Sequence, residues 1–288
     1  MTPTLQPDVV PATRDDFEAV VELGSQRRGY FAAIVDHANL LFHFAARDLR
    51  VRHKQTLVGV AWGLLRPLLS TGAFTIIFGL VAGLPSIGTV AYPLVVFSGI
   101  LPWQLFATGV LHASVSVTQN APLVTRIYFP RIILPLSALV NGLVDFLVGL
   151  TLLILALLIA GEPLTPRLFA LPVFAALALL IAFGFGVWLA ALNVRYRDFS
   201  YLTPFALQLG LFLSPVGFIH ATIPESWRFV YSLNPMVGVI DGFRWSLLES
   251  TGPLDPLPSL MALGMGLVIA TSGVLYFRRA EASFADRI

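Results

Sequence analysis

The stretch "NVRYRDFSYL", residues 193–202, carries three charges between two long uncharged segments. No Asp, Glu, Lys or Arg occurs from Leu168 to Leu192 before these charges, or from Phe199 to Ile219 after them. An apolar segment of about 20 residues is what an α-helix needs to cross the ~30 Å hydrocarbon core of a bilayer. The stretch therefore predicts a short polar loop between two membrane-spanning helices.

The composition of the whole chain fits a membrane protein. Of the 288 residues, 57% are hydrophobic and only 12% are charged, and the mean hydropathy is +0.82. These values lie outside the range of ordinary soluble domains. Six windows are long and apolar enough to span a bilayer: about 57–83, 92–117, 132–160, 168–192, 200–220 and 257–277. We therefore predict an all-α integral membrane protein with six transmembrane helices per protomer, in a membrane domain at 57–277.

Two apolar pieces between the fifth and sixth windows are too short to span. They cover about 224–232 and 235–249 and are interrupted by prolines and charges, namely Pro224, Pro235, Asp241, Arg244 and Glu249. We expect two short re-entrant helices within 224–249.

A different kind of helix is predicted before the first span, at 31–56. Polar residues recur there at spacings of three and four, while the opposite side is apolar. This pattern is typical of an amphipathic helix that lies in the membrane interface. Such a helix can serve as a membrane anchor alone, or it can also present a surface to a cytoplasmic partner. The periodicity of the sequence does not distinguish between these two roles. We expect 1–30 to be a mobile cytoplasmic leader and 278–288 a cytoplasmic tail.

The basic residues indicate how the helices are oriented. Six spans place both termini on one side, which then carries fourteen Lys and Arg residues against three on the other side. The fourteen are Arg14, Arg27, Arg28, Arg47, Arg50, Arg52, Lys54, Arg126, Arg131, Arg195, Arg197, Arg278, Arg279 and Arg287, and the three are Arg167, Arg228 and Arg244. Because cytoplasmic loops are enriched in Lys and Arg, we expect both termini and the loops at 118–131 and 193–199 to be cytoplasmic. Topological anchoring alone then explains the arginines of residues 193–202.

Motifs for chemistry are sparse. The chain has no G-x-x-x-x-G-K-[ST] motif and no cysteine, so we expect no nucleotide bound through a phosphate loop and no thiolate metal site. An ion-coupled carrier needs ionisable residues inside the membrane. The clear candidates are Asp145, one helical turn after Asn141, and Arg66, for which both structural pairing and ion coupling are open.

An intramembrane enzyme is a further alternative. It would need an activated nucleophile, and two groups contain a serine and a histidine: His112 with Ser114 and Ser116, and Ser214 with His220. Neither has a glycine elbow or a second carboxylate, and hydroxyls in membrane helices commonly bond to their own backbone. We therefore expect a transporter rather than an enzyme.

Aromatic residues suggest a pathway for a sugar chain. In the fifth window Tyr201, Phe205, Gln208 and Phe212 follow one another at spacings of four, three and four, on one helix face. Aromatic rings stack on the C–H faces of sugars, and an amide can bond to their hydroxyls. Further candidate wall residues are Trp62, Phe74, Phe78, Trp103 and Phe106. Packing or lipid contact is the alternative for each single ring.

Three blocks together resemble a known family. They are "RDLRVRHKQTLVGVAWGLLRPLL" (47–69), "NVRYRDFSYLTPFALQLGLFLSPVGF" (193–218) and "LNPMVGVIDGFRWSLL" (233–248). The chain from about residue 30 onward resembles the membrane subunit of polysaccharide ATP-binding-cassette exporters, which include the O-antigen permeases and, as relatives, the capsule and teichoic acid exporters.

The resemblance implies a homodimer in the bacterial inner membrane with two copies of a separate ATPase subunit, which binds ATP and Mg. It implies a coupling helix at 118–131, gate helices at 224–249 and a substrate of polysaccharide linked to undecaprenyl diphosphate. The implied docking residues are Arg126, Tyr128, Phe129 and Arg131, and the implied gate residues are Asn234, Pro235, Asp241 and Arg244. No catalytic residue, cofactor, metal or nucleic acid is expected in this chain.

The diphosphate of such a substrate is expected to meet arginines at the inner face, because guanidinium groups bind phosphate oxygens in pairs. The candidates are Arg47, Arg50 and Arg52, with Arg66 standing where the resemblance implies a neutral polar residue. Three rivals remain. An exporter of a drug or small lipid would show a lateral, mostly aliphatic pocket, whereas an enzyme on polyprenyl-linked sugars or an ion-coupled carrier would depend on Ser214 or Asp145.

Overall fold

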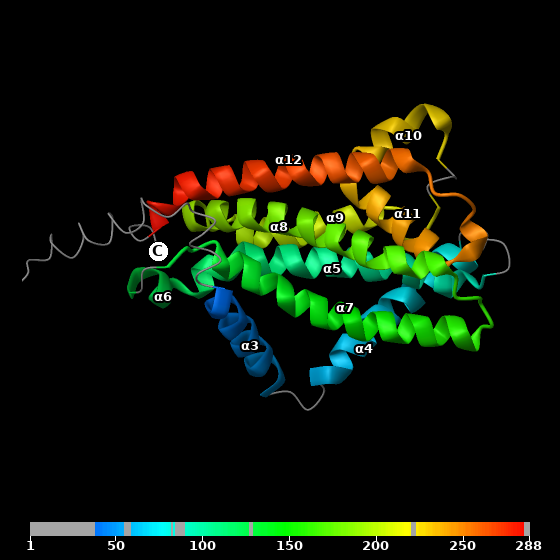
Figure 1. The fold of residues 1–288 in the computed structure, drawn as a ribbon, viewed down its shortest axis with the longest axis horizontal. Coiled ribbons are helices and arrows are strands. Elements are labelled where there is room, and N and C mark those ends of the chain that lie inside the picture. The colour runs from blue at the N-terminus through cyan, green and yellow to red at the C-terminus, as the bar shows by residue number, and fades with distance from the viewer. Residues whose placement is uncertain are drawn as a thin grey trace, which may run out of the picture.

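The structure, a computed structural model, describes residues 38–54, 59–81, 83, 90–126, 129–219 and 223–284. These residues form helices and turns and no strand (Figure 1), which confirms the prediction of an all-α protein. The helices are α3 (Ala38–Lys54), α4 (Gly59–Phe74) with a π-helical continuation (Thr75–Val81), α5 (Tyr92–Gln119), α6 (Ala121–Arg126), α7 (Ile133–Ile159), α8 (Leu171–Arg195), α9 (Phe199–Leu213), α10 (Glu225–Ser232), α11 (Pro235–Leu247) and α12 (Pro256–Glu281). The predicted leader at 1–30 lies outside the described residues.

Five helical segments are long and apolar enough to cross a membrane. They are Gly63–Val81, Tyr92–Gln119, Ile133–Ile159, Pro166–Arg195 and Pro256–Glu281, and they correspond to five of the six predicted windows. Since each exceeds about 17 residues, each reaches the length of a span. The chain is therefore a multi-pass helical membrane protein.

The window at 200–220 gives a shorter helix than predicted. α9 has 15 residues, which at 1.5 Å per residue is roughly 22 Å, less than a hydrocarbon core of ~30 Å. The helix stops because Pro215 follows, and a proline disfavours the helical conformation in the residue before it. Ser214 is accordingly extended, with φ −102° and ψ 153°.

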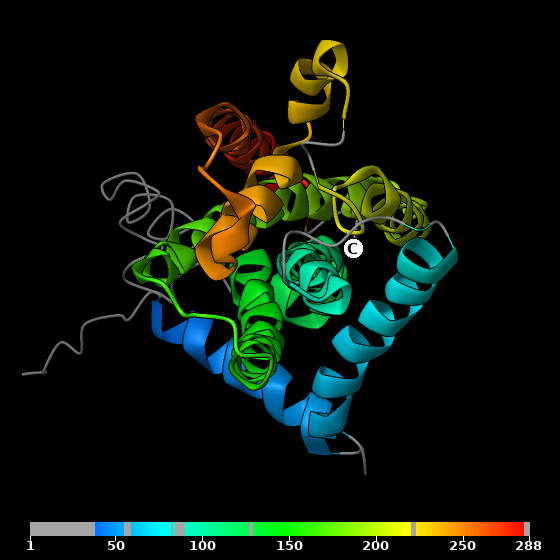
Figure 2. The same ribbon diagram turned by 90° about the vertical axis from the view of Figure 1, so that its right-hand side faces the viewer.

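The helix α5 is the centre of the bundle. Seen from the end in Figure 2, α5 is surrounded by α4, α7, α8 and α11. Its most apolar window is 83% buried, against 17–44% for the other four segments. α5 therefore carries the core, and the other helices keep one face outward.

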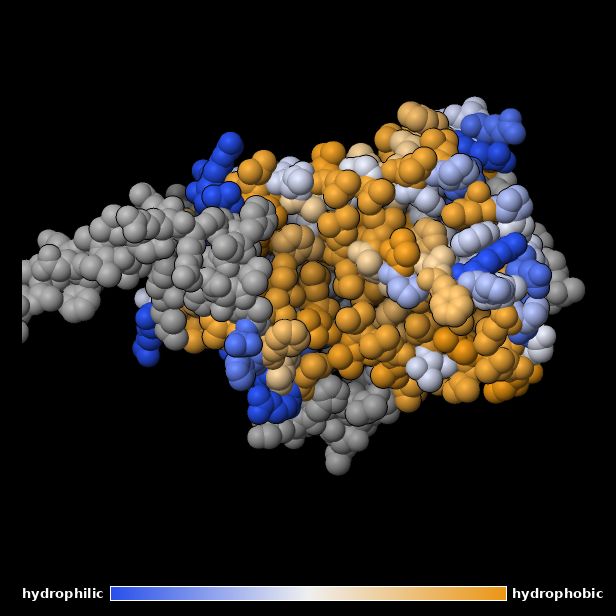
Figure 3. Space-filling model, viewed as in Figure 1, coloured by the Kyte–Doolittle hydropathy of each residue, from blue (hydrophilic) through white to orange (hydrophobic). Residues whose placement is uncertain are grey.

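The outward faces form an apolar belt between two polar ends (Figure 3). α4 is the least buried span and exposes a row of aliphatic side chains, Leu65, Leu68, Leu69, Ile76, Ile77 and Leu80. At one end of the belt lie α3, α6 and the last turn of α12 (Figure 1), which bear Arg126, Arg278 and Arg279. Arg167, just before α8, and Arg228, on α10, belong to the opposite end (Figure 1), so these described arginines lie at two separate ends of the belt.

Small residues let α8 and α12 approach each other closely. A Cβ atom added to Gly184 would lie 2.7 Å from the backbone nitrogen of Ala270, and one on Gly273 would lie 2.8 Å from the carbonyl oxygen of Gly184. Helices in membranes associate through such van der Waals contacts because lipid is as apolar as their side chains. The two helices therefore depend on the absence of a side chain at residue 184.

Gly184→Ala is expected to destabilise the protein by about 1–3 kcal/mol, because the new methyl group meets backbone that cannot rotate away. The control is Gly264→Ala on α12, where an added Cβ meets nothing within 4 Å and the better helix propensity of alanine is slightly stabilising. Thermal unfolding of the two purified variants in detergent measures the difference. Equal melting temperatures would contradict the close-packing argument.

Candidate functional site

An apolar cavity of about 560 Å³ opens between α5, α8, α9, α10 and α11. Trp103 and Phe106 of α5 line it, as do Phe185 of α8 and Gly210 of α9. The Trp103 and Phe106 ring centroids are 5.3 Å apart, and the Phe106 and Phe185 centroids are 6.0 Å apart. Two of the predicted wall residues therefore lie together at a real cavity.

The predicted stripe on α9 exists but faces away from this cavity. Tyr201, Phe205 and Phe212 are 82%, 59% and 53% exposed, and Gln208 is exposed too. The cavity is lined instead by the other side of α9, including Thr203, which is buried. α9 therefore has two distinct faces: one lines the cavity, and the other is largely exposed in this chain.

In the described part of the chain, the outer face of α9 contacts α4 only near its C-terminal end, through a cluster of rings. Phe212 stacks on Phe74, with centroids 5.8 Å apart and planes at 16°, and Phe74 lies 5.4 Å from Phe78. The predicted wall residues Phe74, Phe78 and Phe212 are thus brought together. Trp62 belongs to α4, but its side chain is outside the described part of the structure.

The chain between α9 and α10 is held by polar contacts from α11. Asn234 caps α11: its Oδ1 accepts from the backbone N–H of Met236 at 3.0 Å, and its Nδ2 donates to the Ser214 hydroxyl oxygen at 3.0 Å. Pro235 follows at the first helical position, where its missing N–H costs nothing. Ser214 therefore serves as a structural acceptor here, while its proposed partner His220 lies outside the described residues.

Arg244 is the central residue of this region. Its side chain is 2% exposed, and its guanidinium donates to the carbonyl oxygens of Val216 at 2.6 Å, Phe218 at 2.7 Å and Val95 at 3.3 Å. Gly99 of α5 leaves room for it, since a Cβ there would lie 2.6 Å from Nη2. Arg244 thus joins α11, α5 and the segment after α9.

Two further groups complete the region. The Tyr92 hydroxyl donates to the Gly217 carbonyl oxygen at 2.5 Å. Burial raises the pKa of Asp241 to about 7, and the nearby Arg244 opposes that shift. The sequence singled out Arg244 and Asp241, but it gave no signal for Tyr92, whose partner is 125 residues away.

Arg244→Lys is expected to lower the free energy of unfolding by about 2–4 kcal/mol, because lysine keeps the charge but cannot reach three carbonyl groups at once. The matched control is Arg167→Lys, since Arg167 also donates to backbone carbonyls but is half-buried and its contacts are 3.4–3.5 Å long. Chemical or thermal unfolding in detergent compares the two. A loss no larger than in the control would show that the three carbonyl contacts add little stability.

The predicted docking residues divide into one exposed side chain and two that contact other parts of this chain. Arg126, at the end of α6, is exposed. Phe129 is 5% exposed and packs against Phe44 of α3, with centroids 5.8 Å apart. The Arg131 guanidinium donates to the Glu281 carbonyl oxygen, and the Arg131 backbone N–H donates to Glu281 Oε1 at 2.8 Å. Tyr128 lies outside the described residues, so Arg126 alone is shown at an open surface.

The arginines predicted to bind a lipid diphosphate do not form one cluster in the structure. Arg47 is half-buried and bonded to Asp48 and Asn120, whereas Arg50 donates to the Ala46 carbonyl oxygen of its own helix at 3.1 Å. The Arg52 side chain is outside the described part. Arg66 is exposed on α4, inside the first span, and no ion pair joins it to Asp145 among the described residues. Pairing of these two residues is therefore not observed.

The serines near His112 are engaged in their own helix. The Ser114 hydroxyl donates to the Leu111 carbonyl oxygen and the Ser116 hydroxyl to that of Ala113, both at 2.8 Å. A hydroxyl that donates to a backbone carbonyl is not activated by a base. This geometry gives no support to an intramembrane hydrolase.

Comparison with known proteins identifies the family of this chain. The family model for ABC-2 type transporters matches residues 39–248, so the chain belongs to the ABC-2 type transporter family and is a transporter permease rather than an enzyme. It is similar to the O-antigen export system permease protein RfbA of Myxococcus xanthus, with 29% identity over 88% of this chain and 97% of the relative. Two RfbA proteins of Klebsiella pneumoniae are each 26% identical over 86% of this chain and 94% of their own length.

Proposed function

We propose that this chain is the permease subunit of an ATP-driven exporter that carries polysaccharide linked to undecaprenyl diphosphate across the bacterial inner membrane. The family and the O-antigen export relatives support the exporter class. The observation that supports a polysaccharide substrate is the exposed aromatic stripe of α9. Tyr201, Phe205 and Gln208 form a surface on which sugar rings stack and their hydroxyls find an amide, and this chain buries none of the three.

The functional unit is a homodimer. α4 and α9 adjoin through Phe74 and Phe212 and together leave a broad face uncovered. Two copies facing each other across this surface enclose a channel between the stripes. With α9 as a sixth, shorter span, both termini lie in the cytoplasm, as the arginines at that end require. The exposed Arg66 of α4 meets the diphosphate.

Energy comes from two copies of a separate ATPase subunit, which bind ATP and Mg at the cytoplasmic end. α6 is the docking element because it is a short helix at the polar end with an exposed cation, Arg126, in its last turn. α10 and α11 form the periplasmic gate, with Asn234 and Arg244 fixing their connection to α9.

Arg126→Glu is expected to weaken binding of the ATPase subunit about tenfold, because a docking cation is replaced by an anion. Arg279→Glu on α12 is the control: it makes the same charge change at the same end of the molecule, but off α6. Co-purification of tagged permease with its ATPase measures the complex. An equal effect of the two substitutions would mean that only overall charge matters.

Tyr201→Ala combined with Phe205→Ala is expected to slow glycan export about tenfold, since two stacking contacts are lost. Phe169→Ala is the control, because Phe169 is 88% exposed but lies before α8 at the opposite end. The readout is surface polysaccharide made by cells that express each variant. ATPase binding should be unchanged in all of them.

Wild-type export by the α9 variant would favour a second candidate, an exporter of a drug or small lipid. The lateral cavity beside α9 is the observation behind that candidate, since it is apolar and large enough for a small hydrophobic molecule. Its six aromatic residues, Trp103, Phe106, Phe185, Phe199, Trp227 and Tyr231, set it apart from a mostly aliphatic pocket.

A further inference from the structure

A second, polar cavity of about 530 Å³ lies between α3, α5 and α7, away from the α9 stripe. Charged and amide side chains line it: Arg47 and Asp48 from α3, Gln119 and Asn120 from the end of α5, and His112 and Asn141 deeper in α5 and α7. We call it the α3 cavity. So polar a cavity beside membrane-spanning helices requires a polar occupant.

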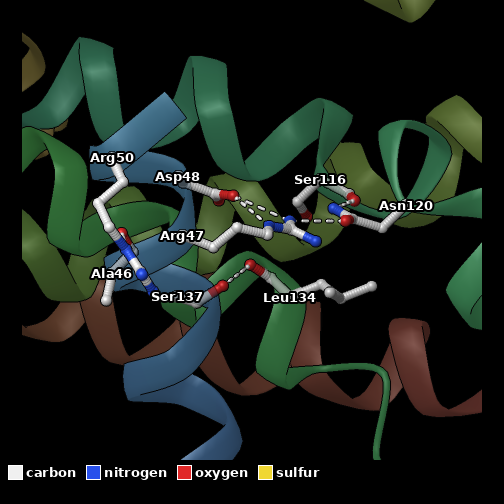
Figure 4. A network of polar contacts seen from close by, with 8 residues as sticks. All are labelled: Ala46, Arg47, Asp48, Arg50, Ser116, Asn120, Leu134 and Ser137. Atoms are coloured by element: carbon white, nitrogen blue, oxygen red, sulfur yellow. Dashed lines mark hydrogen bonds and ion pairs between the residues drawn. The ribbon is translucent and has the colours of Figure 1, made fainter. Parts of the chain in front are cut away.

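The charges of the α3 cavity are balanced. Arg47 donates to Asp48 Oδ1 from Nε at 3.0 Å and from Nη2 at 2.8 Å, and to Asn120 Oδ1 from Nη2 at 2.8 Å, as Figure 4 shows. The side chains of Arg47 and Asp48 remain 40% and 31% exposed, so both are still accessible to a ligand. A dianion at this place would gain from Arg47 but would be repelled by Asp48 beside it. The pair favours a ligand with one charge of each sign.

The inner part of the cavity offers an unused acceptor. Asn141 is 6% exposed, and its Oδ1 has no hydrogen-bond partner in the part of the chain that the structure describes. A buried amide oxygen without a donor costs free energy. A ligand that donates N–H or O–H bonds would recover this cost.

The position of the cavity suggests which ligand is at hand. α3 lies where the polar end of the molecule meets the apolar belt (Figure 3), which is the level of phospholipid headgroups. Phe42 of α3 is 70% exposed, as expected for a side chain that inserts among lipid. Lipid headgroups are therefore the molecules most concentrated beside this cavity.

We propose that the α3 cavity binds the headgroup of a zwitterionic phospholipid with a primary ammonium, phosphatidylethanolamine. The phosphate accepts from Arg47, and the ammonium donates to Asp48 and to Asn141 Oδ1. This site is separate from the export pathway, and its failure would leave the permease assignment standing.

The experiment compares four probes added to delipidated wild-type protein in detergent: phosphatidylethanolamine, phosphatidylcholine, phosphatidylglycerol and farnesyl diphosphate. Native mass spectrometry counts bound lipid, and thermal unfolding gives the stabilisation. Phosphatidylethanolamine should bind about tenfold more tightly than phosphatidylcholine, whose quaternary ammonium cannot donate hydrogen bonds, and than phosphatidylglycerol, which has no cation.

Two substitutions separate a zwitterion from an anion. Arg47→Gln and Asp48→Asn should each weaken phosphatidylethanolamine binding, whereas Asp48→Asn would strengthen the binding of an anion. Arg50→Gln is the control, since Arg50 turns back to Ala46 of its own helix and does not line the cavity. Asn141→Leu, which keeps the number and branching of the side-chain heavy atoms, tests the site without touching the Arg47 contacts, in case Arg47→Gln does not fold.

Preference for phosphatidylethanolamine, lost in Asp48→Asn and in Asn141→Leu but kept in Arg50→Gln, supports the proposal. Tighter binding of farnesyl diphosphate or phosphatidylglycerol that increases in Asp48→Asn would overturn it in favour of an anion site. Equal binding of all four probes would also overturn it, because lipid would then bind without recognition of its headgroup.

Discussion

Backbone carbonyl groups inside an apolar bundle need donors, and much of this structure follows from how that need is met after Leu213. The helix stops there, so the carbonyls of Val216, Gly217 and Phe218 have lost their intrahelical partners. Arg244 supplies donors to two of them and Tyr92 to the third. Because lipid offers no hydrogen bonds, an irregular segment at this place is stable only with such partners. The buried charge is tolerated because its donors are engaged by carbonyl oxygens.

These hydrogen bonds fix the segment after α9 and therefore the position of α9 itself. The C-terminal end of α9 is attached to α11 through Ser214 and Asn234, so this short helix separates the cavity from the outer surface of the chain. Its buried side borders the cavity beside Trp103, and its other side presents Tyr201 and Phe205 outward. A movement of α11 would be transmitted to the end of α9, because Asn234, which caps α11, is hydrogen-bonded to Ser214.

The sequence predicts features that depend on local pattern and misses those that depend on distant partners. Hydropathy identified α5, α7, α8 and α12, because an uninterrupted apolar run has no other stable form in a bilayer. It overestimated α9, although the Ser214-Pro215 step is a local stop signal. The stripe was correctly placed on one face, since helical periodicity determines which residues share a face. The direction of that face was not predictable, because it depends on how α9 packs against Trp103 of α5.

The difference between local patterns and distant partners also explains why the docking residues at the polar end were only partly predictable. Phe129 and Arg131 have the composition of a docking surface, yet their partners are Phe44 and Glu281, far away in the sequence. Through Phe44 and through Arg47, which holds Asn120, α3 is attached to both sides of α6. Arg131 attaches the start of α7 to the end of α12. The residues on either side of α6 are thus attached to α3, and those after it also to α12, so a force on α6 would spread through several helices, as its proposed docking role requires.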